Sequence, residues 1–267
     1  MSAEEFILIS VYVLFGIFGL CVGSFLNVVI YRLPNGMSLS KPSSHCTKCD
    51  YVLRWYDNIP VLSYLMLLGK CRKCKEPISP RYMIVEIINA LLWLLSAYLF
   101  WESSAIYAVA SAIVASTLIC VFFIDLEHLL IFDRFHVIIF IAGFVAIHTD
   151  KSTRWYDHVL GSLICGGFFL LFYFVALKVL KKEGLGFGDV KLAFSVGLLL
   201  GWQRFLLALV IASVSASIIL LIVRKIRNDE EGHEYPFGPF IAVGSLVAMY
   251  FGAPLIDWYV GLLTGII

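Results

Sequence analysis

Long apolar runs separated by short polar segments dominate the chain. Eight such runs are apparent, at 6–31, 83–102, 105–124, 134–149, 158–179, 190–202, 203–223 and 239–258. A helix rises 1.5 Å per residue, so most of these runs are long enough to cross about 30 Å of hydrocarbon. The chain is 61% hydrophobic, whereas about half of the residues of a soluble domain are apolar. The pattern therefore predicts an all-α polytopic membrane protein with about eight transmembrane helices.

One long polar segment, between Arg32 and Arg81, interrupts this pattern. It holds five of the eight prolines and nine of the 20 Lys and Arg residues, a composition typical of a loop-rich region outside the membrane. The sequence thus predicts three parts: a first transmembrane helix at 1–31, a small loop domain at 32–82, and a transmembrane domain at 83–267.

Four cysteines of this loop domain form two Cys-x-x-Cys pairs, Cys46 with Cys49 and Cys71 with Cys74. Four thiolates complete the tetrahedral shell of zinc and leave no open position for water, so the metal would be structural. A redox-active dithiol pair, or thiols without metal, is the alternative. The other three cysteines, Cys21, Cys120 and Cys165, lie in apolar runs and are expected to pack in the core.

The distribution of basic residues predicts the orientation in the membrane. All but three of the 20 Lys and Arg residues fall in the loops after the first, third, fifth and seventh runs, and the exceptions are Lys151, Arg154 and Arg204. Because basic loops stay in the cytoplasm, both termini are expected outside it. The net charge is only +1, which gives no electrostatic argument for nucleic-acid binding.

Small and amide residues predict close contacts between helices. Gly19 and Gly23 are four residues apart, and so are Gly197 and Gly201, which is the spacing of helix faces that approach one another closely. Asn27 follows on a nearby face of the first helix. We expect it to form an interhelical hydrogen bond, and a functional role is the alternative.

Two aspartates stand at the ends of apolar runs. Asp125 directly follows Val121 to Ile124, and Asp189 follows a glycine-rich stretch that begins at Gly184. An acid at the edge of a bilayer is costly, and the predicted topology places both acids on the cytoplasmic face. The short run after Asp189 is expected to be a re-entrant or broken helix buried by protein rather than a simple lipid-facing span. An alternative role for Asp189 is to cap that helix.

A pair of nearby, partly buried carboxylates has a defined chemistry. The two groups cannot both ionise easily and therefore share a proton. The ionised member can then draw a proton from water while the neutral member donates one to a peptide carbonyl. Asp133 and Glu127 lie in the same loop region as Asp125 and are its rivals, but a solvated-loop role is favoured for both.

Several motifs follow one another in a specific order. They are Gly23-Ser24-Phe25-Leu26-Asn27 with Tyr31-Arg32-Leu33-Pro34, the two Cys-x-x-Cys pairs, Arg81-Tyr82 with Val85-Glu86, Ile124-Asp125 with Asp133, Gly186-Phe187-Gly188-Asp189-Val190-Lys191, and Pro236-Phe237-Gly238-Pro239-Phe240. In this order they resemble the bacterial prepilin peptidases, or type IV leader peptidases, over nearly the whole chain. Members of that family commonly have Pro-Asp where this chain has Phe132-Asp133.

The resemblance implies a membrane aspartic protease of the GxGD class in the bacterial inner membrane, with Asp125 and Asp189 as its catalytic dyad. Its substrates would be prepilins and pseudopilins of type IV pili or type II secretion, cut after a Gly that ends a short basic leader. Family members with the cysteine-bearing loop typically also methylate the new amino terminus with S-adenosylmethionine. The sequence identifies no residues for that methyl donor. Glu127 and Glu183 are candidates for attracting the leader, although solvated-loop roles are favoured.

Two other classes of protein remain as alternatives. A polytopic transporter would carry acids near the middle of the bilayer and an internal repeat, neither of which is apparent. A membrane scaffold would use the two Cys-x-x-Cys pairs and their zinc ion to recruit a partner. That function would not explain Asp125 and Asp189. Leader removal from a synthetic prepilin discriminates an enzyme from both.

Overall fold

Each of the eight apolar runs forms a helix in the computed structural model, which describes residues 2–180, 186–227 and 235–265. The chain divides into two compact units, Met1–Leu99 and Phe100–Ile267, and each is described by itself. The three parts expected from the sequence, 1–31, 32–82 and 83–267, are functional divisions and not packing units. Their limits stay a prediction. Glu183 and Gly184 lie outside the described residues.

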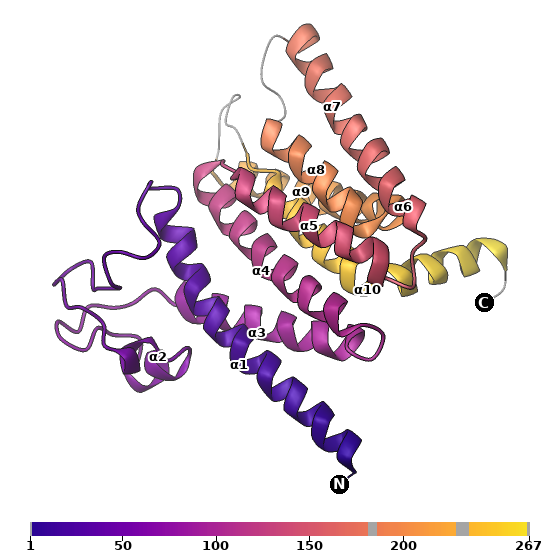
Figure 1. Cartoon of the computed structure of the whole chain (residues 1–267). Coiled ribbons are helices and arrows are strands. Elements are labelled where there is room, and N and C mark those ends of the chain that lie inside the picture. The colour runs from indigo at the N-terminus through magenta and orange to yellow at the C-terminus, as the bar shows by residue number, and fades with distance from the viewer. Residues whose placement is uncertain (1, 181–185, 228–234, 266–267) are drawn as a thin grey trace. The chain divides into compact units, whose positions relative to one another are not determined.

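Two long helices, α1 (Ala3–Arg32) and α3 (Arg81–Phe100), frame the first unit. The loop domain between them contains a 3₁₀ turn (Trp55–Asn58) and the short α2 (Leu62–Met66) (Figure 1). A capping box starts α1: the Ser2 hydroxyl accepts a hydrogen bond from the Glu5 N–H, and the Glu5 carboxylate accepts one from the Ser2 N–H. Such a box satisfies two donors that a helix start leaves unpaired.

Glycine and asparagine join α1 to α3, as the sequence predicts. A Cβ added at Gly19 would lie 2.8 Å from the Ala90 Cα, and one added at Gly23 would lie 2.8 Å from the Glu86 Cα. Nδ2 of Asn27 donates to the Tyr82 carbonyl at 3.0 Å, and Nδ2 of Asn89 donates to the Gly19 carbonyl at 2.7 Å. The two helix backbones therefore touch, and only glycine permits that approach.

The second unit is a helical bundle. Its elements are α4 (Ala105–His128), α5 (Asp133–Thr149), α6 (Trp155–Leu160), a π-helical turn (Gly161–Cys165), α7 (Gly166–Val175), a second π-helical turn (Ala176–Leu180), α8 (Phe187–Leu200), α9 (Trp202–Arg227) and α10 (Gly238–Thr264). The segment from Trp155 to Leu180 is one continuous helical rod. The main packing pairs are α9 with α10, α5 with α8, and α4 with both α5 and α10.

The short helix α8 lies inside this bundle, as expected for a helix covered by protein. Ten of its 14 residues are buried, and α5, α7 and the first π-helical turn pack around it. Gly197 meets Gly161 closely, since a Cβ on Gly197 would lie 2.4 Å from the Gly161 carbonyl oxygen. Gly201 takes part in the same close contact, as predicted, since a Cβ on Gly161 would lie 2.7 Å from the Gly201 carbonyl carbon. Gly201 has φ +77° and forms the turn between α8 and α9, a conformation that favours glycine.

A buried ion pair closes one end of this bundle. Arg204 donates to Asp150 at 2.9 Å, and both side chains are less than 10% exposed. Tyr107, near the start of α4, lies close enough to interact electrostatically with both. Asp125 stands at the other end of the same helix, so the two charged sites of this unit are separated by most of the length of α4.

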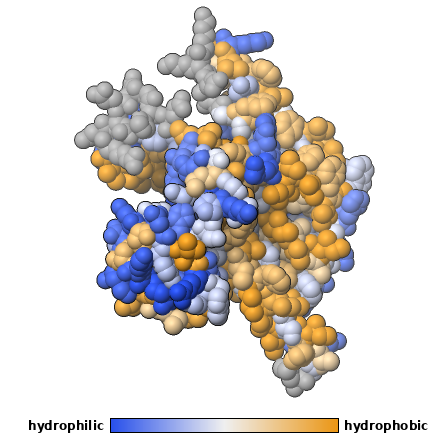
Figure 2. Space-filling view, turned by 60° about the vertical axis from the view of Figure 1, so that its left-hand side comes forward, coloured by the Kyte–Doolittle hydropathy of each residue, from blue (hydrophilic) through white to orange (hydrophobic). Residues whose placement is uncertain are grey.

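Six helices are long and apolar enough to cross a membrane among the described residues, and the protein is a multi-pass membrane protein. They are Ala3–Arg32, Arg81–Phe100, Ala105–His128, Trp155–Val179, Trp202–Ile226 and Gly238–Thr264. The two remaining predicted spans form α5, with 17 residues, and α8, with 14. In Figure 2 hydrophilic residues form a large patch at the lower left, and hydrophobic residues predominate over much of the right-hand side.

The cysteines outside the loop domain differ in burial. Cys120 and Cys165 are buried, as predicted. The prediction for Cys21 is wrong: this side chain is exposed on α1. An apolar run in a membrane helix is apolar on the lipid side as well, so its composition does not identify the buried face.

Candidate functional site

Asp125 lies in the last turn of α4, where that helix ends. Leu129 adopts φ 55° and its N–H bonds to the Asp125 carbonyl, which terminates the helix. The Asp125 carboxylate is buried, with 6% of the residue exposed, and its Oδ2 accepts a hydrogen bond of 3.0 Å from the Gly238 N–H. Gly238 is the first residue of α10, so the positive end of a helix dipole faces this carboxylate.

Gly238 fits this place because it has no side chain. A Cβ there would lie 2.5 Å from Oδ2 of Asp125 and 3.1 Å from Cδ1 of Ile131. Ile131 also packs against Gly188, where an added Cβ would lie 3.2 Å from the Ile131 Cβ. The loop after α4 is thereby wedged between the starts of α8 and α10. The sequence motif around Gly238 carried the resemblance, but the sequence did not reveal this contact.

Asp189 is the third residue of α8 and is also buried, with 8% exposed. Its carboxylate accepts a hydrogen bond from the Gly186 N–H, as the third residue of a capping box does. Asp189 therefore helps to cap α8, as the alternative expected, although the N-cap position itself is occupied by Gly186. Oδ1 of Asp189 is buried without a hydrogen-bond partner among the described residues. A cap needs only one of the two oxygens, so the capping role leaves Oδ1 unexplained.

The structure brings Asp125 and Asp189 together although they are 64 residues apart in the chain. The charge of Asp125 acts directly on the Asp189 carboxyl group. Both groups are withdrawn from water at the junction of α4, α8 and α10. Such a pair has the elements of an acid and base that activate water.

The rival acids have different surroundings. Asp133 forms an ion pair of 2.5 Å with Lys191, and its side chain is 75% exposed. Glu127 is also exposed. Exposure of both groups agrees with the solvated roles expected from the sequence.

The four cysteines of the loop domain converge as predicted. Their sulfur atoms all lie within 4.8 Å of one another, with 3.8 Å between Cys46 and Cys74 and 4.0 Å between Cys49 and Cys71. Zinc bonded to four sulfurs at about 2.3 Å requires sulfur atoms about 3.8 Å apart. The four sulfur positions therefore fit a zinc ion.

The two Cys-x-x-Cys turns, residues 46–51 and 71–76, are called knuckles here. They have the same backbone hydrogen-bond pattern at an offset of 25 residues. The Cys46 N–H bonds to the Tyr51 carbonyl and the Cys71 N–H to the Glu76 carbonyl, at 2.9 and 2.8 Å. The turn residues Asp50 and Lys75 both have positive φ, and their N–H groups bond back to the first cysteine of each pair. Two matching turns thus present their thiols to a common centre.

Amide groups around the knuckles stabilise thiolate. The N–H groups of Cys74 and Lys73 bond to the Cys71 sulfur and lower the pKa of that thiol to about 6. At Cys74 the Glu76 N–H also favours thiolate, but burial and the other three cysteines outweigh it and raise the pKa to about 12. A bound dication relieves this repulsion between thiolates, because metal binding displaces the thiol protons.

The carboxylate of Asp57 contacts residues of both knuckles and stabilises the second one. Its carboxylate accepts a bond of 2.6 Å from Nε of Arg72 and one of 3.0 Å from the Tyr51 hydroxyl. Burial raises the pKa of Asp57, but these bonds and the Arg54 N–H more than offset it and leave the pKa below its ordinary value. The sequence gave no signal for this residue, because its partners come from a turn that sequence patterns do not specify.

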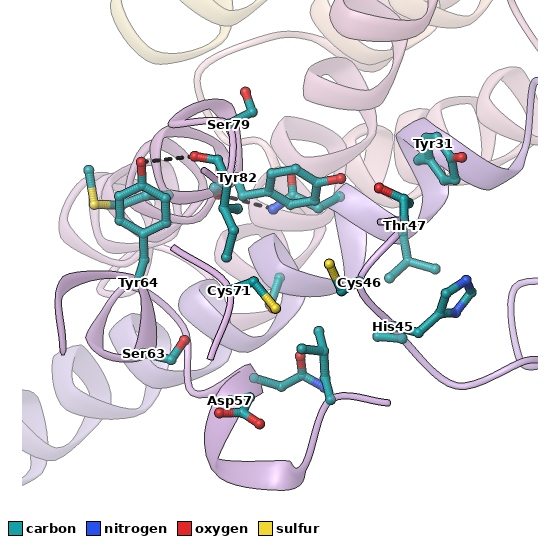
Figure 3. A pocket seen from close by; sticks show the side chains of 18 of the residues that line it. Tyr31, His45, Cys46, Thr47, Asp57, Ser63, Tyr64, Cys71, Ser79 and Tyr82 are labelled. Atoms are coloured by element: carbon teal, nitrogen blue, oxygen red, sulfur yellow. Dashed lines mark hydrogen bonds between the residues drawn. The ribbon is translucent and has the colours of Figure 1, made fainter. Parts of the chain in front are cut away.

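A pocket of about 750 Å³ lies between the knuckles, the last turns of α1 and the start of α3. All of its lining residues belong to the first unit. Figure 3 shows side chains from each of these parts, including Tyr31, Cys46, Asp57, Tyr64 and Tyr82. The pocket was not apparent from the sequence, because its walls come from separate segments of the loop domain.

Two polar residues on helix faces also line this pocket. Glu86 is 8% exposed, its Oε2 accepts a bond of 2.7 Å from the Val61 N–H, and the Ser24 hydroxyl is bonded to it as well. Asn27 is 4% exposed. Sequence analysis singled out Asn27 as a helix-packing residue and named Glu86 only within a motif, and it did not place the two in one site.

Comparison with known proteins covers both units. Residues 17–100 match the Bacterial Peptidase A24 N-terminal domain, and residues 112–221 match the Type IV leader peptidase family. The first match contains the cysteine pairs and the pocket. The second contains Asp125 and Asp189.

Similar proteins align over most of their length. A prepilin leader peptidase/N-methyltransferase of Legionella pneumophila is 33% identical over 94% of both chains, and one of Pseudomonas aeruginosa is 33% identical over 90% of both. A type 4 prepilin-like proteins leader peptide-processing enzyme of Escherichia coli is 35% identical over 88% of this chain and 92% of its own. No solved structure matches the chain. Two family matches and relatives of this extent show that the chain belongs to the type IV leader peptidase family.

Proposed function

We propose that this protein is a membrane aspartic endopeptidase that removes the short basic leader of type IV prepilins and pseudopilins after a Gly. The assigned dyad is Asp125 and Asp189. The observation that carries this assignment is the meeting of two buried carboxylates, remote in sequence, at the junction of three helix ends. The similar proteins named for prepilin processing support the substrate class.

The hydrogen bonds suggest a role for each carboxylate. Each carboxylate accepts one backbone N–H, Asp125 from Gly238 and Asp189 from Gly186. The second oxygen of Asp189 is buried without a donor among the described residues, which disfavours the ionised form of that carboxylate. We therefore assign Asp125 as the base that takes a proton from water as the water oxygen attacks the scissile carbonyl. Asp189, whose Oδ1 is unpartnered among the described residues, is the neutral member that donates a proton to the carbonyl oxygen. The C–N bond then breaks, the departing amine takes up the proton held by Asp125, and one hydroxyl of the diol returns its proton to Asp189 as the C=O bond re-forms.

The position of the dyad suits the proposed substrate. A pilin precursor has a basic leader followed by a long apolar helix, so the bond between them lies at the membrane surface. Asp125 and Asp189 lie at helix ends, and the positive-inside rule assigns those ends to the cytoplasmic face of the bacterial inner membrane, with the amino terminus outside. The enzyme would therefore meet the bond where the leader leaves the bilayer.

We assign a structural zinc ion to Cys46, Cys49, Cys71 and Cys74. When bound, the metal supplies cross-linking of the two knuckles and no catalytic chemistry, because four protein ligands complete its shell. The same unit is the proposed site of the second activity, N-methylation of the new amino terminus with S-adenosylmethionine as methyl donor. The pocket volume of about 750 Å³ lies within the range of sites that hold drug-sized molecules.

Cleavage of a synthetic prepilin by the purified protein in detergent tests the peptidase assignment. Mass spectrometry identifies the cleaved bond and any added methyl group. Asp125→Asn and Asp189→Asn should each abolish leader removal while the zinc content stays that of the wild type. Full processing by the doubly substituted protein would refute the dyad, and no cleavage by the wild type would favour the transporter or scaffold.

A further inference from the structure

The pocket of the first unit contains a buried hydrogen-bond acceptor without a partner. Nδ2 of Asn27 donates to the carbonyl oxygens of Gly23, at 3.3 Å, and of Tyr82, at 3.0 Å. These two bonds use both amide hydrogens and fix which side-chain atom is oxygen. Oδ1 of Asn27 is buried and bonds to none of the described residues. A buried acceptor left unpaired is costly, so this atom is suited to a donor that arrives with a ligand.

Glu86 provides a second acceptor close to the first. Asn27 and Ser24 are three residues apart on α1, and Ser24 is bonded to Glu86. Tyr82 and Glu86 are four residues apart on α3, and Asn27 is bonded to the Tyr82 carbonyl. Residues three or four apart share one face of a helix. Asn27 and Glu86 thus lie on neighbouring turns of α1 and α3, and both line the pocket.

The charge of Glu86 is not balanced by its identified hydrogen bonds. The Val61 N–H and the Ser24 hydroxyl are neutral donors, and a carboxylate can accept more bonds than these two. A buried acid beside an unpaired carbonyl-type oxygen favours a cation that carries several N–H groups. A primary ammonium group meets this description.

We propose that Glu86 and Oδ1 of Asn27 form a binding site for a primary ammonium group in this pocket. The inference rests on the proposed methyl transfer, in which two reactants carry such a group: the new amino terminus of the cleaved pilin and the amino-acid part of the methyl donor. The rings of Tyr31, Tyr64 and Tyr82 line the same pocket. Aromatic faces of this kind attract cations such as a sulfonium and stack on flat ring systems.

When the bound ammonium is the pilin terminus, Glu86 also suits the proton transfer that methylation of an amine requires. The ammonium form has no free electron pair, so it must first give a proton to the carboxylate. The nitrogen pair then attacks the methyl carbon, the bond from that carbon to sulfur breaks, and its electron pair stays on sulfur as a neutral thioether. The product is a secondary ammonium, and the proton on Glu86 passes to water.

Glu86→Gln tests this site, because Gln keeps an oxygen acceptor for the Val61 N–H and removes only the charge. The assay supplies cleaved pilin peptide and tritiated methyl donor, and measures KM for the peptide and Kd for the donor separately. We expect one of the two constants to rise roughly tenfold to hundredfold, the usual effect of losing a charged hydrogen bond. A rise in KM identifies the pilin terminus as the bound ammonium, and a rise in Kd identifies the donor. No change in either constant would overturn the proposal.

Glu102→Gln is the matched control, because it makes the same Glu to Gln change elsewhere. Glu102 is exposed and lies outside the pocket lining. It should leave both constants unchanged. Equal effects of the two variants would show that the response is one of overall charge and would refute the site.

A second measurement uses the unaltered protein and does not depend on the folding of a variant. The methyl donor and a cleaved pilin peptide, each with a photoreactive group next to its ammonium, are cross-linked in turn, and the adducts are mapped by mass spectrometry. Adducts of either probe at residues 21–37 or 44–86 support the site, and adducts of both confined to residues 100–267 overturn it. If the wild type cleaves prepilin but never methylates it, the proposed second activity fails, whereas the cross-link still reports whether the ammonium site exists.

Discussion

The two units hold their polar sites by different means. In the first unit, Met1–Leu99, four cysteine sulfurs within 4.8 Å of one another fix loops that have little regular structure. In the second unit, Phe100–Ile267, Asp125 and Asp189 stand on the ends of buried helices, and glycine contacts fix their positions. One site thus depends on the proposed metal centre and the other on helix packing.

This difference predicts which changes each site tolerates. Loops joined by a metal lose their arrangement when a ligand is lost, because metal binding and folding are coupled. Helix ends buried in a bundle keep their arrangement after one polar substitution, but a single added methyl group at a close contact displaces the groups there. Substitutions can therefore separate leader removal from methyl transfer in both directions.

The largest expected effect is on the dyad. Asp189→Asn should lower kcat for leader removal at least roughly a thousandfold, since Asn cannot transfer the proton. The same variant should methylate a cleaved pilin peptide at the wild-type rate, because Asp189 belongs to the second unit. Parallel assays of prepilin cleavage and methyl incorporation measure both effects. A matching fall in methylation would contradict the separation of the two units.

The converse change is loss of a zinc ligand. Cys71→Ser should lower the bound zinc from about one ion per chain to near zero and reduce methyl transfer roughly a hundredfold, since the knuckles that wall the pocket lose their common centre. Leader removal should persist at a reduced but measurable rate. Elemental analysis and the two assays give the result. Cys120→Ser, a buried cysteine of the second unit, is the control that should keep its zinc.

A smaller effect is expected at the glycine beside Asp125. A Cβ at position 238 would lie 2.5 Å from Oδ2 of Asp125, so Gly238→Ala should push the carboxylate out of place and lower kcat roughly tenfold to hundredfold. Gly167→Ala is the matched control, because a Cβ there meets no atom within 4 Å. Equal activity of the two variants would show that the position of Asp125 is not critical.

Most of the helical fold and the members of both clusters could be predicted from the sequence. Apolar run length reflects bilayer thickness, and the cysteine spacing reflects the coordination of zinc. The Gly19 and Asn27 contacts followed from rules for close helix packing. These features depend on local patterns, which a single sequence displays.

The rest depends on contacts between distant segments. The Gly238 N–H meets Asp125 across 113 residues, and Asp57 finds Arg72 through the folding of a loop. The orientation of a membrane helix is equally hidden, because lipid-facing and buried sides are both apolar. That is why Cys21 was expected in the core and is exposed.

A moderate effect on the rate of zinc release is expected at Asp57, which contacts the second knuckle. Asp57→Asn removes the charge that holds Arg72 and the Tyr51 hydroxyl, and we expect zinc release to a chelator to become roughly tenfold faster. The rate is followed with a zinc-sensitive dye at fixed chelator concentration. Asp50→Asn, an exposed acid of the other knuckle, should release zinc at the wild-type rate. Unchanged release from the Asp57 variant would show that the metal centre does not need these contacts.

The smallest effect is expected at Asp133, and it sharpens the assignment of the dyad. Asp133 is an exposed acid paired with Lys191 on the same face of the bundle as Asp189, and surface ion pairs contribute little to stability. Asp133→Asn should keep kcat for leader removal within about threefold of the wild type. Lys191→Gln, which breaks the same pair from the other side, should behave alike if the pair is only a surface contact. A fall in kcat as large as that of Asp189→Asn would identify Asp133 as a member of the catalytic pair. Loss of a surface ion pair is too weak to cause such a fall, whereas loss of a carboxylate that transfers a proton would cause it.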